Sequence, residues 1–170
     1  MSITTKTGDK GQSGLLGGKR LNKTDLRFDA VGALDELTAS LGVAKAATQS
    51  NTLKGQIEEI QLELIKLAAE AATPAEVFEN FKDKFPPESA PDELHKKIAK
   101  LEEGVEMKDF VLPGDSAVNA ALHVARTVCR RAERELWRLH DAGGLKRNLP
   151  CVYLNRLADL LWLWAKTNRN

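Results

Sequence analysis

Apolar residues recur every three or four positions over most of the chain, which is the spacing of helices that bury one face. The stretches with this pattern are about Asp25–Thr48, Thr52–Ala72, Asp92–Val105, Ser116–His140 and Pro150–Lys166. No stretch shows the strong alternation of a β-strand. The pattern therefore predicts an all-α fold, an antiparallel bundle of about five helices.

Proline and glycine mark the connections between these helices. Four prolines fall between residues 73 and 91, which predicts a loop with one short turn around "AEVFENF". Pro113 and Gly114 break the chain before Ser116, whose hydroxyl can cap the helix that follows. Asp92 is the predicted cap of the helix that ends near Val105.

Length and composition are those of an ordinary globular protein. The chain has 170 residues, of which 42% are hydrophobic and 29% charged, so we expect a single domain over residues 1–170. No apolar run approaches the ~18 residues of a membrane span, and the first residues lack the apolar core of a signal peptide. Cys129 and Cys151 suggest neither a disulfide framework nor a zinc site. We expect a cytoplasmic protein with no membrane partner.

The predicted helix from Ser116 to His140 has two distinct faces when its residues are placed at 100° steps. One face is apolar and consists of Leu122, Ala125, Val128, Ala132, Leu136 and Leu139. Arginines rise on three successive turns of the other side, with polar and aromatic companions. This second set is Arg126, Arg130 and Arg134, together with Asn119, His123, Glu133 and Trp137.

The arginine row has three interpretations. Forked guanidinium groups can grip phosphates bidentately. The same row can be a solvated surface with pairs such as Arg130 and Glu133 at i,i+3 spacing. Nucleic-acid binding is the third, but an isoelectric point near 7.8 and the lack of aromatic residues among the basic ones argue against it. The helix by itself leaves the first two open. Asn155 lies on a similar polar stripe of the last helix.

The chain opens with a glycine-rich stretch, "TTKTGDKGQSGLLGGKR", from Thr4 to Arg20. It is not a Walker A loop, because Ser13 and Arg20 stand where glycine and Ser or Thr are needed. It also lacks the dinucleotide fingerprint and a βαβ unit. The stretch is either a tail or an anion nest of backbone N–H groups. The nest would use Gly8, Gly11 and Gly14, the hydroxyls of Thr5, Thr7 and Ser13, and the charges of Lys6, Lys10 and Lys23.

Several motifs, taken together and in order, are more specific than any one of them. They are "TKTGDKGQSGLLGG", then Lys23 and Arg27, then "AVGALDELTASLG", "DFVLPGDSAVNAALHVARTVCRRAERE" and "YLNRLADLL". This series closely resembles the PduO-type ATP:cob(I)alamin adenosyltransferases. The resemblance covers residues 4–42 and 109–163, and residues 73–100 match only loosely.

The resemblance implies a bundle that forms homotrimers, with an active site at each subunit interface. The nucleotide would be held by the N-terminal stretch and by polar side chains of the last two helices. Magnesium is expected on the phosphate oxygens of ATP, with no protein metal site. The implied nucleotide-binding residues are Thr5, Lys6, Thr7, Gly8, Ser13, Gly14, Lys23, Arg130, Arg131, Glu133, Arg134 and Asn155.

The resemblance also implies a reaction and its catalytic residues. Cob(I)alamin attacks C5′ of ATP, which gives adenosylcobalamin and releases triphosphate. Arg130 would face the phosphates, and Asp35 would pair with the partner subunit's Arg126. Phe110 would lie against the lower face of the corrin, where it excludes the axial ligand of cob(II)alamin so that cobalt is more easily reduced. No general base is needed, because Co(I) is itself the nucleophile.

Partners follow from this chemistry. A flavoprotein reductase would supply reducing equivalents, and a B12-dependent enzyme would receive the product. No nucleic-acid partner is expected. Two other functions remain open at the level of sequence: a non-catalytic bundle that binds a nucleotide, and a basic-faced bundle that binds nucleic acid.

Overall fold

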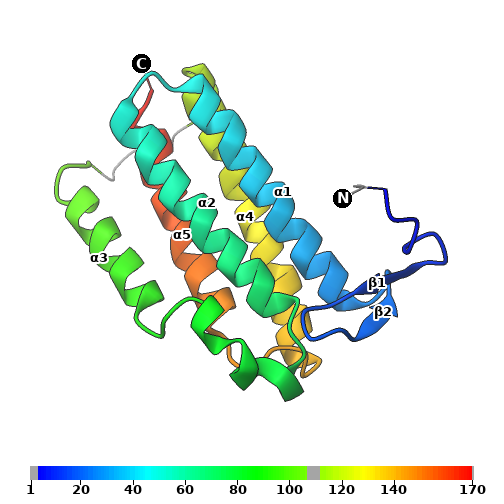
Figure 1. Cartoon of the computed structure of the whole chain (residues 1–170). Coiled ribbons are helices and arrows are strands. Elements are labelled where there is room, and N and C mark those ends of the chain that lie inside the picture. Colours follow the sequence, from blue (N-terminus) through cyan, green and yellow to red (C-terminus); the bar gives the residue numbers. More distant parts are fainter. Residues whose placement is uncertain (1–3, 107–111, 170) are drawn as a thin grey trace.

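The computed structural model describes residues 4–106 and 112–169, and this part of the chain is mostly helical (Figure 1). α1 packs against α2 and α4, and α5 packs against α4 and α3. The colours in Figure 1 show that α2 and α4 run opposite to α1 and α5, and that α3 lies beside α5 and runs the same way as α5. The α-helices are α1 (Leu26–Ala47), α2 (Asn51–Ala71), α3 (Ala90–Glu102), α4 (Ala117–Asp141) and α5 (Leu149–Thr167).

The core consists of the inward stripes of these helices. The predicted apolar face of α4 is confirmed, since Leu122, Ala125, Ala132 and Leu136 are fully buried and Leu139 nearly so. Leucine and isoleucine from α1, α2 and α5 complete the core. Burial of each such side chain stabilises the fold by roughly 1.5–3 kcal/mol. The largest fully buried ones include Leu34, Leu37, Leu41, Ile57, Leu64, Leu67, Leu154, Leu157, Leu160 and Leu161.

Side-chain caps set where the helices begin. The predicted cap at Ser116 is confirmed, because its side chain accepts a hydrogen bond from the backbone N–H of Asn119. The predicted cap at Asp92 is wrong. α3 begins two residues earlier, at Ala90, and Asp92 lies in its first turn. Pro91 explains the earlier start, because proline is favoured in a first helical turn, where its missing N–H costs no hydrogen bond.

Two polar residues of α4 do not lie where the helical periodicity placed them. Asn119 and His123 were expected on the arginine face, but both are buried. The side-chain amide of Asn119 donates to the carbonyl of Ala165 at 2.8 Å and accepts from the N–H of Gly114 at 2.8 Å. The end of α5 and the connection before α4 therefore cover this side of α4, which a single-helix pattern does not reveal.

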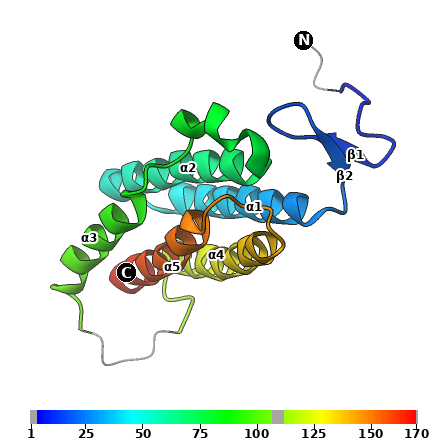
Figure 2. The ribbon, with the colours of Figure 1, turned by 90° about the horizontal axis from the view of Figure 1, so that it is seen from below.

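The only strands in the described part of the chain are formed by the glycine-rich stretch and the two residues that follow it. β1 (Gln12–Gly14) pairs antiparallel with β2 (Arg20–Asn22), with Ser13 opposite Leu21. Strands of three residues are too short to show an alternating pattern, so the all-α prediction omitted them. The hairpin lies beside the start of α1, away from α3 and α5 (Figure 2).

Residues 73–91 form more structure than the one turn expected. Two 3-10 helices, η1 (Ala75–Asn80) and η2 (Lys82–Lys84), follow α2 and precede α3. The rings of Phe78 and Phe85 pack against each other with centroids 5.0 Å apart. Across the described helices, none combines the length and the hydropathy needed to cross a membrane.

Candidate functional site

The N-terminal stretch, residues 4–23, includes the hairpin, and its first residues fold back against the two strands. The guanidinium of Arg20 donates to the carbonyls of Thr7 at 2.8 Å and Gln12 at 3.0 Å. The N–H of Lys23 donates to the carbonyl of Gly11 at 2.8 Å, and a Cβ on Gly8 would lie 3.0 Å from the Lys23 ammonium nitrogen. Gly8 therefore permits the close approach of this cation, as its place in a nest requires.

The other predicted residues of this stretch lie along the same exposed ribbon. The hydroxyls of Thr5 and Thr7 are 2.9 Å apart, and Lys6 has a positive φ of 56°. Ser13 and Gly14 belong to β1, and Lys23 follows β2. The structure thus gathers the predicted N-terminal residues into one folded unit, with the Arg20 guanidinium bonded to it and the Lys23 ammonium close to Gly8.

A second group forms where α4 faces α5. One guanidinium nitrogen of Arg130 lies 2.9 Å from a Glu133 carboxylate oxygen and 3.2 Å from the side-chain oxygen of Asn155. Arg134 donates to the backbone carbonyl of Arg130 at 3.1 Å. The Arg130–Glu133 pair expected from i,i+3 spacing is therefore present, and Asn155 joins it from the neighbouring helix. Half of the Arg130 side chain stays exposed, so it remains accessible to an anion.

The charges around this group are balanced. Burial raises the pKa of Asp159, one turn beyond Asn155 on α5, and the nearby Arg130 opposes that shift. Arg130 thus lies near two carboxylates, and the contacts with Glu133 and Asn155 hold its guanidinium in place. Such an arrangement is suited to binding a polyanion whose charge exceeds that of its protein neighbours.

Arg131 does not join this group. Its guanidinium lies 2.5 Å from a carboxylate oxygen of Glu36, which belongs to α1. The hydrogen bond from Arg131 lowers the pKa of Glu36. Arg131 therefore links α4 to α1, and its assignment to the nucleotide together with Arg130 stays a prediction.

The predicted catalytic residues Asp35 and Arg126 occupy different helices. Asp35 is exposed and lines a hollow of about 270 Å³ between α1 and α2, together with Val31, Thr38 and Ile65. Arg126 is half-buried on α4, and its Nε has no hydrogen-bond partner among the described residues. Their expected pairing joins two subunits and stays a prediction. Phe110, the residue expected against the corrin, lies outside the described residues.

The two groups lie apart within one chain. Over residues 4–106 and 112–169, no hydrogen bond or ion pair joins the N-terminal stretch to Arg130, Glu133 or Asn155. Figure 2 shows the hairpin beside α1, with α5 on another side of the bundle. The described part of a single chain thus leaves the two groups unconnected.

Sequence reasoning cited Arg27 only as part of a motif and missed its structural role. Its buried guanidinium donates to the carbonyls of Ala71 at 2.5 Å, Thr73 at 3.0 Å and Gly144 at 2.7 Å. Burial lowers the pKa of Arg27, and the nearby carboxylates of Asp25 and Glu76 oppose that shift. Arg27 thus ties the start of α1, next to the hairpin, to the end of α2 and the α4–α5 connection.

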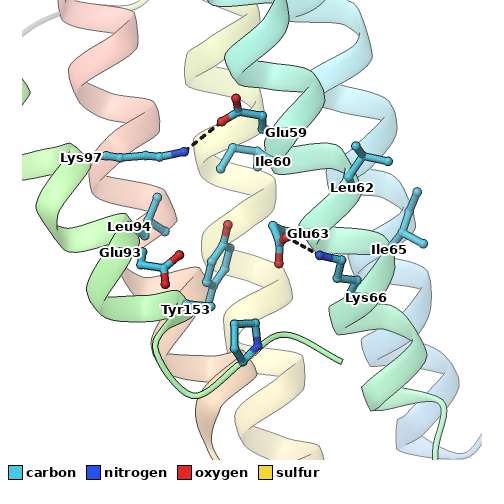
Figure 3. A pocket seen from close by; sticks show the side chains of 12 residues that line it. Glu59, Ile60, Leu62, Glu63, Ile65, Lys66, Glu93, Leu94, Lys97 and Tyr153 are labelled. Atoms are coloured by element: carbon cyan, nitrogen blue, oxygen red, sulfur yellow. Dashed lines mark hydrogen bonds and ion pairs between the residues drawn. The ribbon is translucent and has the colours of Figure 1, made fainter. Parts of the chain in front are cut away.

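A hollow of about 630 Å³ between α2, α3 and α5 contains none of the predicted site residues (Figure 3). Its charges are largely paired with each other: Lys97 lies 2.9 Å from Glu59, and Lys66 lies 2.7 Å from Glu63. Leu62 and Ile65 are exposed at its edge. Volume alone therefore does not identify the candidate site.

The thiols and possible metal ligands offer no alternative chemistry in the described chain. Burial raises the pKa of Cys151 to about 12, and the Cys129 thiol donates to the carbonyl of Leu154 at 3.3 Å. Both are therefore poor nucleophiles. Among residues 4–106 and 112–169, no group of three or more His, Cys, Asp or Glu side chains is arranged to hold a metal ion.

The buried side chain of His123 makes the stability of the fold depend on pH. Both ring nitrogens are buried without a hydrogen-bond partner in the described part of the chain. Burial lowers the pKa of His123 below its ordinary 6.5, Arg126 lowers it further, and Asp115 opposes the shift. The unfolded chain therefore binds a proton on His123 more readily than the folded chain does. The free energy of unfolding is not reduced by this effect above pH 6.5, and it falls as the pH drops from 6.5 toward the folded-state pKa.

We expect His123→Gln to reduce this pH dependence. The free energy of unfolding is measured with urea from about pH 7.5 to about pH 5.5. It should fall more steeply with decreasing pH in the wild type than in the variant, by up to about 1.4 kcal/mol per pH unit. The matched control is His95→Gln, at an exposed position of α3. Equal slopes in wild type and His123→Gln would contradict the prediction.

Comparisons with known proteins extend the resemblance to nearly the whole chain. The sequence matches the cobalamin adenosyltransferase family over residues 3–168. A corrinoid adenosyltransferase of Mycobacterium tuberculosis is 41% identical over 172 residues, covering 96% of this chain and 86% of the relative.

Solved structures agree with this match. A phenylalanine-to-alanine variant of the PduO-type ATP:corrinoid adenosyltransferase from Lactobacillus reuteri, complexed with cobalamin and ATP, has a TM-score of 0.88 and 36% identity, covering 97% of this chain and 92% of that one. An arginine-to-lysine variant complexed with ATP has the same TM-score and identity, with coverage of 99% and 94%.

The PduO-type resemblance expected from the motifs at both ends of the sequence is thus confirmed. The match includes residues 73–100, where the motifs themselves agreed only loosely. The chain belongs to the cobalamin adenosyltransferase family.

Proposed function

We propose that this protein transfers the 5′-deoxyadenosyl group of ATP to the cobalt of cob(I)alamin. The cobalt electron pair attacks C5′, so a cobalt–carbon bond forms while the C5′–oxygen bond breaks. The bonding electrons of the C5′–oxygen bond leave with triphosphate, and adenosylcobalamin is the other product. Family membership supports this reaction, as do the relatives that are complexed with cobalamin and ATP.

The observation that carries the proposal is the position of Arg130. Its forked cation is held by Glu133 and Asn155 and is half exposed on the face between α4 and α5. In the Lactobacillus reuteri enzyme, the substituted phenylalanine and arginine have the same separation in sequence as Phe110 and Arg130 have here. Arg130 would stabilise the charge that develops on the departing triphosphate, which needs fixed cationic donors and no general base.

The N-terminal stretch is the proposed partner of Arg130. Thr5, Lys6, Thr7, Gly8, Ser13, Gly14 and Lys23 would wrap the triphosphate and nucleoside, because folded backbone N–H groups and a nearby ammonium suit an anion. Magnesium would enter on the phosphate oxygens, consistent with its tendency to keep most of its water ligands. Arg134 and Asn155 would complete the nucleotide site.

The separation of the two residue groups supports a site shared between subunits. We infer a homotrimer in which Asp35 of one protomer pairs with the partner subunit's Arg126. The hollow beside Asp35 is compatible with such a contact, and so is the Nε of Arg126, which lacks a hydrogen-bond partner among residues 4–106 and 112–169. A reductase would supply electrons, and a B12-dependent enzyme would accept the product. A mass measurement in solution tests the assembly directly.

A turnover assay tests the reaction. Purified protein is mixed with MgATP and with cob(I)alamin generated by a strong reductant, and the light-sensitive spectrum of adenosylcobalamin is followed. Product that depends on both substrates is expected. If the protein binds ATP in a parallel titration but forms no product, the proposed reaction is wrong and a non-catalytic nucleotide-binding function takes its place.

Phe110→Ala should separate cobalt reduction from adenosyl transfer. A bulky apolar side chain on the lower face of the corrin would exclude water and the dimethylbenzimidazole base, which makes cob(II)alamin easier to reduce. Losing the burial of one phenylalanine should lower the rate with cob(II)alamin and a reductase by about 10- to 100-fold. The rate with pre-reduced cob(I)alamin should fall much less, and the ATP dissociation constant should not change.

The rates with cob(II)alamin and cob(I)alamin and the ATP dissociation constant are all measured on Phe110→Ala, so each measurement serves as a control for the others. An equal loss with cob(I)alamin and cob(II)alamin would indicate a role in corrin binding alone. Wild-type kinetics with both forms would contradict the role of Phe110 altogether.

A further inference from the structure

The turn between β1 and β2 rests on residues that follow α2. The N–H of Leu16 donates to the carbonyl of Ala72 at 3.2 Å, and Leu15 is buried. Lys19 lies 3.7 Å from a carboxylate oxygen of Glu76, in η1. This turn, called the glycine turn because it contains Gly17 and Gly18, is therefore in contact with the end of α2 and with η1.

Gly17 shows how close this contact is. Its φ of 92° lies in the left-handed region that favours glycine, and a Cβ there would lie 3.0 Å from a methyl carbon of Val77 and 3.8 Å from the ring of Phe81. Two independent features thus favour glycine at this position: the backbone conformation and the tight approach to Val77. The turn therefore packs directly against η1.

The supporting segment is in turn held firmly by the bundle. Arg147, in the α4–α5 connection, binds both carboxylate oxygens of buried Glu70 at 2.8 Å and the carbonyl of Pro86 at 2.7 Å. It also lies 2.5 Å from Glu88 and 5.4 Å from the centre of the Phe78 ring. A bidentate pair with a buried carboxylate fixes geometry more strictly than an exposed pair does.

We propose that residues 75–84 form a platform that sets the position of the glycine turn, and that Val77 is the positioning residue. This inference rests on the proposed function, because the same hairpin contains Ser13 and Gly14 and leads into Lys23. By holding the turn at a fixed height above the end of α2, the platform preorganises the N-terminal stretch for ATP. It gives the 73–91 segment, which matched the family motifs only loosely, a role in nucleotide affinity.

A double-mutant cycle between Gly17 and Val77 tests the platform. Gly17→Ala introduces a methyl group against Val77 and should raise the KM for ATP at least about tenfold, with kcat changed much less. Val77→Ala removes the contact and should raise the KM for ATP about three- to tenfold. The KM for ATP of the double variant should be smaller than the product of the two single changes predicts. The reason is that removing the Val77 methyl groups makes room for the methyl group of Ala at position 17.

Three further measurements separate positioning from general structure. The KM for cobalamin and the midpoint of thermal unfolding should stay close to wild type in Val77→Ala. Glu79→Ala is the matched control, since Glu79 is exposed on η1 and pairs only with Lys82 among the described residues. It should leave the KM for ATP unchanged.

The outcomes distinguish the platform from the proposed reaction. A wild-type KM for ATP in both single variants, with an active wild-type enzyme, would overturn the platform alone. Additive effects of Gly17→Ala and Val77→Ala would also overturn it. If the wild type forms no adenosylcobalamin but the dissociation constant for ATP shows the expected coupling, the platform stands and the proposed reaction is wrong.

Discussion

Replacing Arg130 with alanine is expected to lower kcat for adenosylcobalamin formation by about 100- to 1,000-fold, the usual loss when one preorganised donor to a developing anion is removed. The reason lies in the arrangement of α4 and α5. Glu133 and Asn155 hold the guanidinium at 2.9 and 3.2 Å, so its cost of reorganisation during the reaction is small. The loss should fall mainly on kcat, because the charge on the leaving triphosphate grows in the transition state.

Two companion variants sharpen this test. Arg130→Lys keeps the charge but loses the fork, so it should retain more activity than alanine and less than wild type. Arg138→Ala is the matched control, because Arg138 lies two turns farther along α4 and pairs with Glu135. Its kinetics should be those of the wild type. Wild-type turnover in Arg130→Ala would remove Arg130 from the proposed mechanism.

Replacing Arg27 with alanine is expected to lower the free energy of unfolding by about 2–4 kcal/mol, because three carbonyl acceptors lose a charged donor and a buried volume is left empty. For a chain of this size the midpoint of thermal unfolding should fall by roughly 5–15 °C. The acceptors belong to Ala71, Thr73 and Gly144 and lie far from Arg27 in sequence. The loss of stability therefore arises because these carbonyls are no longer joined through a single guanidinium group.

Urea unfolding followed by circular dichroism measures this cost. Arg138→Ala again serves as the control, since exposed ion pairs contribute only about 0–1 kcal/mol. Arg27→Lys should also be destabilised, because an ammonium cannot reach three carbonyls from one planar group. Equal stability of wild type and Arg27→Ala would mean that water replaces these hydrogen bonds at no net cost.

The parts of the structure that follow from short-range rules were predictable from the sequence. The apolar spacing placed the long helices to within a few residues, and the cap at Ser116 involves an N–H only three positions away. The Arg130–Glu133 pair also lies within one helical turn. These features depend on neighbours in sequence, so one chain without relatives was enough to predict them.

Predictions failed where a residue's environment came from another element. Asn119 and His123 have the periodicity of the arginine face, yet the end of α5 and the connection before α4 bury that part of it. The contact of Arg131 also comes from another element, since Arg131 pairs with Glu36 of α1, and its role at the nucleotide stays a prediction. The two short strands lacked a detectable pattern because their stability comes from pairing and from the contact with the end of α2.

The sequence by itself determined the helices, the arginine row, the glycine-rich stretch and, through the order of its motifs, the family. Only the tertiary structure decided which charges work together. It placed Asn155 beside Arg130, buried Arg27 among carbonyls 44 to 117 positions away, and seated the glycine turn on Val77. The physical reason is that periodicity reports where a side chain lies around its own helix axis. Its contacts, burial and pKa depend on segments that only folding brings together.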